Sequence, residues 1–273
     1  MISRLVEFIQ AHPRLLVLTG AGCSADSGIP TYRDDQGTWQ RSTPIRHQDF
    51  IDSEASRRRY WTRSLVGWPA VRDAAPGPAH GALAALENQG LVRLLVTQNV
   101  DRLHQRAGQR QVVDLHGRLD QVVCLACGHV SSRDEVQQQL LELNPRLAAD
   151  SAAVSLAPDG DADVPERWVD TLRIPECRYC GGTLKPNVVF FGGSVDRDLV
   201  AFVYDEIEAS DAVLVVGSSL MVFSGYRFCR HAAQQHKPIA CINRGRTRAD
   251  DLFSLKLEQE CGAVLEALCQ ALP

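Results

Sequence analysis

The sequence predicts an α/β fold in which a parallel β-sheet carries helices on both faces and a smaller unit is inserted into the chain. Short, wholly apolar runs recur along the chain, and glycine or small polar residues follow them directly. Such runs are typical of strands that are buried on both faces of a parallel sheet. Two Cys-x-x-Cys pairs in the middle of the chain indicate the inserted unit, because this spacing is typical of a metal-binding module.

Composition excludes several classes of protein. The 273 residues allow one large unit and one small unit, and a hydrophobic content of 45% is ample for a core. The net charge of −4 provides no overall positive field for nucleic acid, and no apolar run of about 18 residues predicts a membrane span. An amphipathic helix is predicted from Ile2 without a signal-peptide core, so we expect a cytoplasmic protein whose nine cysteines are reduced.

Leu15–Leu18 is the first predicted strand, and the turn Thr19-Gly20-Ala21-Gly22 follows it. Glycines permit a sharp turn and let a phosphate approach backbone N–H groups. Ser24–Ser27 offers helix-capping residues, so we expect a helix to begin there with its N-terminus toward an anion. These features indicate a dinucleotide site, although GxG without a third glycine is equally compatible with a plain strand-to-helix turn. Gly28-Ile29-Pro30 then ends the helix and leaves Arg33 on a loop, where it can reach a phosphate or ribose.

Helices are predicted next over Arg57–Leu65 and His80–Gln89. Two tryptophans, Trp61 and Trp68, either line a pocket or pack in the core. We expect His104 on the surface of a short helix, and we expect no site role for the other histidines apart from His116, including His80.

Polar side chains follow the next two predicted strands, Val92–Val96 and Val112–Leu115. Because parallel strands end at one edge of their sheet, where ligands bind, these side chains form a candidate site: Gln98, Asn99, Asp101 and His116. Each of them taken alone is equally compatible with a helix cap or a turn.

Four cysteines form two Cys-x-x-Cys-Gly sequences: Cys124, Cys127, Cys177 and Cys180. Four thiolates in two such turns suit a tetrahedral structural zinc ion, and a redox pair or two disulfides is the alternative. The long gap between the pairs predicts a helix over Arg133–Leu143 and a loop over Leu156–Asp161. The other five cysteines are interpreted as small buried residues.

The last third of the chain returns to the sheet. Strands are predicted over Leu184–Gly192, Val213–Gly217 and Ile239–Asn243, and a final helix over Ala263–Leu272. Gly217-Ser218-Ser219 supplies N–H and hydroxyl donors at the sheet edge, which suits a phosphate or ribose.

Three of these segments resemble, in order, motifs of the sirtuins, the NAD-dependent protein-lysine deacylases: GAGCSADSGIPTYRD, TQNVDRLHQRAG and the Leu-His-Gly at 115–117. The resemblance covers nearly the whole chain. The long gap with its LAPDGD loop resembles the class II branch, which includes a mitochondrial lipoamidase-type enzyme and bacterial relatives. One departure is Gly193, where many relatives have an acidic residue.

The resemblance implies site residues position by position. His116 would be the catalytic base, and Asn99 and Asp101 would act on the nicotinamide ribose. The implied NAD contacts are Gly20, Ala21, Gly22, Ser24, Ala25, Ile29, Pro30, Tyr32, Arg33, Trp39, Gln40, Gln98, Asn99, Val100, Asp101, Gly217, Ser218, Ser219, Asn243, Arg244, Gly245 and Cys261. Four cysteines, Cys124, Cys127, Cys177 and Cys180, would hold one structural zinc ion.

The resemblance also implies organisation and activity. A Rossmann-like NAD-binding domain would comprise residues 1–36, 77–117 and 187–273, and a small domain would comprise a helical insertion at 37–76 and a zinc module at 118–186. The enzyme would transfer an acyl group from a protein lysine to ADP-ribose and release nicotinamide. Relatives that prefer acidic acyl groups hold the carboxylate with a tyrosine and an arginine. Ser64 and Gly67 occupy those positions here, so neutral acyl groups are expected to react better than succinyl. The alternative is that the neighbouring Arg63 takes the place of the missing arginine.

Other classes of function stay open. A protein mono-ADP-ribosyltransferase would also begin by releasing nicotinamide, whereas a non-catalytic NAD-sensing module would bind NAD without releasing it. The acidic balance of the chain disfavours a zinc-dependent nucleic-acid binder.

Overall fold

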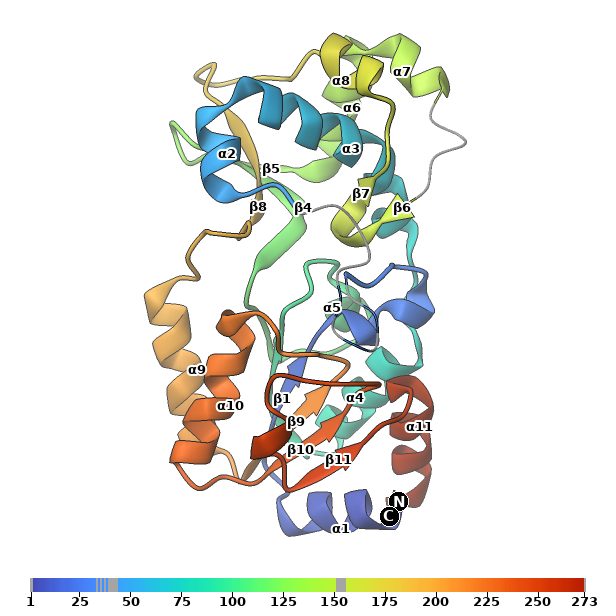
Figure 1. Ribbon diagram of the computed structural model, residues 1–273, viewed down its shortest axis with the longest axis vertical. Coiled ribbons are helices and arrows are strands. Elements are labelled where there is room, and N and C mark those ends of the chain that lie inside the picture. Colours follow the sequence, from blue (N-terminus) through green and yellow to red (C-terminus); the bar gives the residue numbers. More distant parts are fainter. Residues whose placement is uncertain are drawn as a thin grey trace.

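The computed structural model describes residues 2–32, 34, 36, 38, 44–150 and 156–272, and the chain forms a larger unit with a central sheet and a smaller unit beside it (Figure 1). The predicted α/β fold is confirmed. No helix in these described ranges is long and apolar enough to cross a membrane.

The main sheet contains six parallel strands in the order β11-β10-β9-β1-β2-β3. Their bounds are β1 (Leu15–Thr19), β2 (Val92–Thr97), β3 (Val112–Asp114), β9 (Ala212–Val216), β10 (Ile239–Ile242) and β11 (Leu255–Leu257). Five of these match predicted strands, and β11 was not predicted. The strand order reverses between β1 and β9, and ligands of such sheets bind at the carboxyl side of that reversal.

Helices cover both faces of this sheet (Figure 1). One face packs against α1 (Ile2–Ala11), α4 (Pro78–Asn88) and α11 (Cys261–Ala271), and the other against α9 (Arg197–Ala209) and α10 (Phe223–Gln234). All five residues of β1 and of β9 are buried, which explains why these strands are wholly apolar apart from Thr19.

The smaller unit packs helices against a three-stranded antiparallel sheet in the order β5-β4-β8. Its elements are α2 (His47–Asp52), α3 (Glu54–Asp73), β4 (Gly117–Cys124), β5 (Val130–Ser132), α6 (Arg133–Leu143), α7 (Pro145–Asp150), β6 (Leu156–Ala157), β7 (Asp161–Ala162), α8 (Glu166–Thr171) and β8 (Leu184–Val188). Trp61 and Trp68 are both buried, which agrees with core packing. The prediction of α6 is confirmed residue for residue.

Three predicted local structures are wrong. The strand predicted over Leu184–Gly192 was expected in the main sheet, but β8 (Leu184–Val188) ends at Val188 and pairs with β4 in the sheet of the smaller unit. Ala21–Cys23 and Ala25–Ser27 form two short 3-10 turns instead of the start of an α-helix, because this loop bonds to the loop after β9 through Gly22 N–H and the Gly217 carbonyl (2.8 Å). The predicted loop at 156–161 is a small antiparallel ladder of β6 and β7 around a 3-10 turn at Pro158–Gly160.

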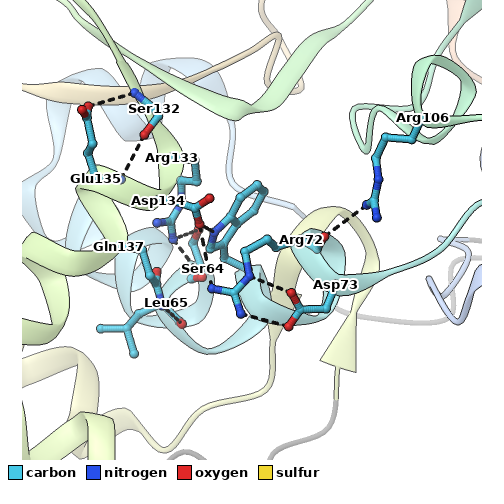
Figure 2. Close-up of polar contacts among 11 residues, drawn as sticks. Ser64, Leu65, Arg72, Asp73, Arg106, Ser132, Arg133, Asp134, Glu135 and Gln137 are labelled. Carbon is cyan, nitrogen blue, oxygen red and sulfur yellow. Dashed lines mark hydrogen bonds and ion pairs between the residues drawn. The ribbon is translucent and has the colours of Figure 1, made fainter.

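Side chains of α6 donate hydrogen bonds to the carbonyl oxygens of Ser64 and Leu65 in α3 (Figure 2). Pro69 has no N–H, so the carbonyl of Leu65, four residues earlier, loses its normal helical donor. Gln137 of α6 supplies the replacement, since its Nε2 donates to the Leu65 carbonyl oxygen at 2.8 Å. One turn earlier on α6, the wholly buried Arg133 donates from Nη2 to the carbonyl and hydroxyl oxygens of Ser64, each at 3.1 Å. The carbonyl that Pro69 leaves without a helical donor and the polar face of α6 therefore fit each other.

Candidate active site

A cavity of about 840 Å³ lies at the carboxyl edge of the main sheet, and both units line it. Gly20 and Ser218 come from the loops after β1 and β9, whereas Tyr60 and Asp161 come from the smaller unit. This volume is within the usual range of about 300–1,000 Å³ for small-molecule sites. The cavity therefore lies at the reversal of strand order, where the fold leads one to expect a ligand.

The structure brings together most of the residues predicted to contact NAD. Those in the cavity wall are Gly20, Ala21, Gly22, Ala25, Tyr32, Gln98, Asn99, Val100, Gly217, Ser218, Ser219, Asn243, Arg244 and Cys261. His116, the predicted base, lies in the same wall. Ser24, Ile29, Pro30, Asp101 and Gly245 are not part of that wall. Arg33, Trp39 and Gln40 lie outside the described residues.

The glycines after β1 line the cavity and also pack closely against the loop after β9. A Cβ atom on Gly20 would lie 2.8 Å from the Cβ of Ser218, and one on Gly22 would lie 2.8 Å from the Cα of Gly217. Any larger residue would therefore push the two loops apart. Their close contact forms the floor of the cavity and keeps backbone groups open to a ligand.

Ser24, Asn99 and Asp101 form one buried hydrogen-bond network beside the cavity. The Asn99 amide donates to the Gly20 carbonyl and to Ser24 Oγ, both at 3.0 Å. Ser24 Oγ donates to Asp101 Oδ2 at 2.6 Å, and Leu103 N–H donates to Asp101 Oδ1 at 2.9 Å. Asp101 thus fixes Ser24, and Ser24 in turn fixes Asn99. Of the three residues, Asn99 is the one that lines the cavity.

The expectation that His104 lies on the surface is wrong, and His80 is buried beside it. His104 of α5 (Leu103–Arg106) is 1% exposed, and its Nε2 bonds to Thr19 Oγ1 at 3.0 Å. His80 is fully buried, packs edge-on against His104 at 4.7 Å, and lies 3.4 Å from Ser24 Oγ. Burial lowers the pKa of both imidazoles, most strongly for His104, so both are neutral. Through Thr19 and Ser24, the two rings contact the end of β1 and the loop that follows it.

His116 has a defined tautomer. Its Nδ1 lies 3.0 Å from the carbonyl oxygen of Gln98, and a carbonyl only accepts, so Nδ1 carries the hydrogen. Burial lowers the pKa of His116, and the nearby positive charge of Arg227 adds to this effect. The ring is therefore neutral, and Nε2 keeps a lone pair that can accept a proton.

The part of the cavity wall formed by the smaller unit carries an ion pair. Arg63 Nε lies 2.7 Å from Asp161 Oδ1 and 3.0 Å from the Ala162 carbonyl oxygen, and Arg63 is buried. A Cβ atom on Gly67 would lie 2.3 Å from the Gly160 carbonyl oxygen, so the glycine lets the Pro158–Asp161 turn pack directly on α3. Ser64 bonds to Arg133. Beside Ser64 and Gly67, the cavity wall therefore presents the carboxylate of Asp161, and Arg63 is already paired with that carboxylate.

The four cysteines meet in a cluster that could hold a metal ion. All four Sγ atoms lie within 4.8 Å of one another, with Cys124 and Cys180 3.5 Å apart and Cys127 and Cys177 3.8 Å apart. A tetrahedral zinc ion with Zn–S bonds of about 2.3 Å holds its sulfurs about 3.8 Å apart, so the donor set fits zinc. Gly128 and Gly181, which follow the two pairs, both have left-handed φ angles, 71° and 70°, that turn each thiol pair inward.

The sequence did not predict the site contacts of three residues: His80, Asp161 and Ser224. Ser224 Oγ lies 2.7 Å from His116 Nε2 although the two residues are 108 positions apart. Each of the three is a common residue type outside a dense motif, so only the folded chain shows its partner.

Comparison with known proteins agrees with this geometry. The model of the family described as "Sir2 family" matches residues 20–224. The chain is 54% identical over 264 residues to NAD-dependent protein deacetylase 2 of Bradyrhizobium diazoefficiens, covering 97% of this chain and 96% of that protein. It is 48% identical over 267 residues to the human mitochondrial NAD-dependent protein lipoamidase sirtuin-4, covering 97% of this chain and 84% of that protein.

Two solved structures extend the likeness to three dimensions. One, from work on the mechanism and regulation of Sir2 enzymes, aligns with a TM-score of 0.76 at 30% identity and covers 98% of this chain and 96% of that one. A complex of Sir2 with a p53 peptide and NAD+ aligns with a TM-score of 0.79 at 25% identity, covering 99% and 98%. With the fold, the cavity and these matches in agreement, the chain belongs to the Sir2 family of sirtuins.

Proposed function

We propose that this chain is an NAD-dependent protein-lysine deacylase that transfers an acyl group from lysine to ADP-ribose and releases nicotinamide. Relatives that match almost its whole length are named as enzymes of this kind. NAD supplies the sugar that loses nicotinamide and the hydroxyl that receives the acyl group. Acyl-lysine-bearing proteins are the proposed partners.

The observation that carries this proposal is the neutral, correctly oriented His116 in the cavity wall. Nδ1–H is held by the Gln98 carbonyl, so Nε2 is the nitrogen that accepts a proton from a sugar hydroxyl. When the ring becomes positive, the same carbonyl stabilises it through Nδ1–H. A neutral ring near pH 7 suits a general base, because the acceptor is ready without prior deprotonation.

The cavity fits a dinucleotide on the evidence of its donors and its shape. Tightly packed glycine turns after β1 and β9 expose backbone groups at the sheet edge, and Ser218 and Ser219 add hydroxyl groups. Asn99, which lines the cavity and is held by Ser24, would contact the nicotinamide end of NAD.

We further propose that Cys124, Cys127, Cys177 and Cys180 hold one structural zinc ion. The cluster is separate from His116 and offers four thiols, which leaves no ligand position for substrate. We keep the division of the chain into a NAD-binding domain (1–36, 77–117 and 187–273) and a small domain (37–76 and 118–186) as part of this proposal. All nine cysteines are free, which supports a reducing location such as the cytoplasm.

The test is product analysis by mass spectrometry with NAD and a panel of acyl-lysine peptides. Nicotinamide, free lysine peptide and O-acyl-ADP-ribose are expected in equal amounts, and His116→Ala should remove the last two. ADP-ribose on the protein or peptide would instead identify a mono-ADP-ribosyltransferase. Tight NAD binding with no nicotinamide release from any peptide would identify an NAD-sensing module.

A further inference from the structure

The basic nitrogen of His116 is already bonded in the structure. Because Nδ1 donates to the Gln98 carbonyl and burial keeps the ring neutral, Nε2 has only a lone pair to offer. Ser224 Oγ lies 2.7 Å away, so the serine hydroxyl must be the donor in this bond. The atom that is proposed to take the substrate proton is therefore covered by a serine.

The position of Ser224 is fixed by its neighbours. Ser224 is the second residue of α10, and both it and His116 line the cavity. The next residue, Gly225, has no room for a side chain, since a Cβ there would lie 2.4 Å from Gln98 Oε1. The start of α10 thus packs directly against Gln98, whose own carbonyl holds the His116 ring. Ser224 and His116 are positioned by one shared contact.

A substrate hydroxyl can reach Nε2 in two ways. The substrate hydroxyl can displace Ser224 from Nε2. The serine would then lose its bond to His116, which is the partner of its hydroxyl among the described residues. Alternatively, it can donate to Ser224 Oγ, which has lone pairs free while its own hydrogen points at Nε2. The second route breaks no existing bond and uses an oxygen already in the cavity wall.

We propose that Ser224 is a catalytic residue that relays the proton from the sugar hydroxyl to His116; this inference rests on the proposed function. The sugar O–H bond breaks and its proton binds Ser224 Oγ, while the Ser224 proton moves to Nε2. The serine is regenerated as a neutral hydroxyl, and His116 becomes an imidazolium held by the Gln98 carbonyl. The electron pair of the broken O–H bond stays on the sugar oxygen, which attacks the acyl carbon.

The charged group next to this relay is Arg227, one turn further along α10. Its guanidinium carbon lies 5.0 Å from the centre of the Phe223 ring, and its positive charge opposes protonation of His116. This repulsion keeps the resting ring neutral and favours return of the proton to solvent after the reaction.

The test compares Ser224→Ala, Ser224→Thr and the unmodified enzyme, with Ser254→Ala as control. Ser254 donates to the Ile239 carbonyl and is not part of the cavity wall, so its loss should leave the rates unchanged. Two rates are measured on one acyl peptide: nicotinamide exchange and O-acyl-ADP-ribose formation. Melting temperature and zinc content show that each variant is folded.

The relay predicts that Ser224→Ala keeps nicotinamide exchange and slows O-acyl-ADP-ribose formation by roughly 10- to 100-fold, while Ser224→Thr retains most of the rate. In mixtures of light and heavy water the unmodified enzyme should give a curved proton inventory, for two moving protons, and Ser224→Ala a linear one. An unchanged or faster Ser224→Ala enzyme would show that the serine is only a cap on Nε2. If the unmodified enzyme releases no nicotinamide, the proposed function fails first and the relay with it.

Discussion

The hydrogen bond from Gln137 to the Leu65 carbonyl, four residues before Pro69, gives a quantitative prediction. Gln137→Met keeps the volume of the side chain but removes the amide, so the Leu65 carbonyl is left buried without its donor. An unsatisfied buried acceptor costs about 1–3 kcal/mol, and the free energy of unfolding should fall by that amount. Gln137 itself is 5% exposed, so water cannot readily take over the bond.

Pro69→Ala tests the cause. Alanine restores the backbone N–H that can donate to the Leu65 carbonyl, so Gln137→Met should cost much less in the Pro69→Ala chain. The coupling energy of the double-mutant cycle should reach about 1–2 kcal/mol. Gln138→Met is the matched control, because Gln138 bonds to Glu142 on the exposed side of the same helix.

The assay is urea unfolding of the zinc-loaded protein, followed by tryptophan fluorescence. Trp61, Trp68 and Trp168 are buried in or beside the core of the smaller unit, so the signal reports on this unit. An equal loss of stability from Gln137→Met in both backgrounds would refute the reasoning, because the amide would then contribute something other than the missing helical donor.

Three other predictions concern the metal, the acyl group and pH. Cys124→Ser should lower zinc content and melting temperature together, since structural zinc binding is coupled to folding. Cys269→Ser, outside the cluster, is the control and should change neither. A metal-free protein with an unchanged melting temperature would contradict the zinc site. Asp161→Asn should raise kcat/KM for succinyl-lysine relative to acetyl-lysine on the same peptide, because it removes a like charge from the cavity wall and takes from Arg63 its nearest carboxylate partner. An unchanged ratio would show that the acyl chain does not reach this pair. His104 stays neutral in the folded chain but gains a proton below about pH 6.5 in the unfolded chain, so the free energy of unfolding should fall as the pH drops from 7 to 5. His104→Asn should make that slope shallower by up to about 1.4 kcal/mol per pH unit. Equal slopes for the two proteins in urea titrations would contradict the assignment.

Most of the main sheet could be read from the sequence because its strands are buried on both faces. Such strands are short apolar runs with polar ends, as in β1 and β9, and need no knowledge of their partners. The four cysteines were equally accessible, since their spacing alone fits one metal. By contrast, β11 is a three-residue strand, Leu-Lys-Leu, whose pairing with β10 decides its conformation.

The failures concern contacts between distant segments. His104 looks like a polar residue on a four-residue helix, and only its bond to Thr19, 85 positions away, makes it a buried group. The loop after β1 contains helix-capping residues, yet the loop after β9 fixes its conformation. Such outcomes depend on tertiary packing, which overrides local preference.

The central place of β1 has a consequence for synthesis of the chain. Arg14, next to β1, bonds to Asp211, next to β9, across 197 residues of sequence. At about 5–20 residues per second, a ribosome needs roughly 10–40 s to deliver β9 after β1. During that interval one edge of β1 stays unpaired, while both cysteine pairs emerge before β9. The cysteine cluster, and with it the smaller unit, can therefore form before the main sheet is complete.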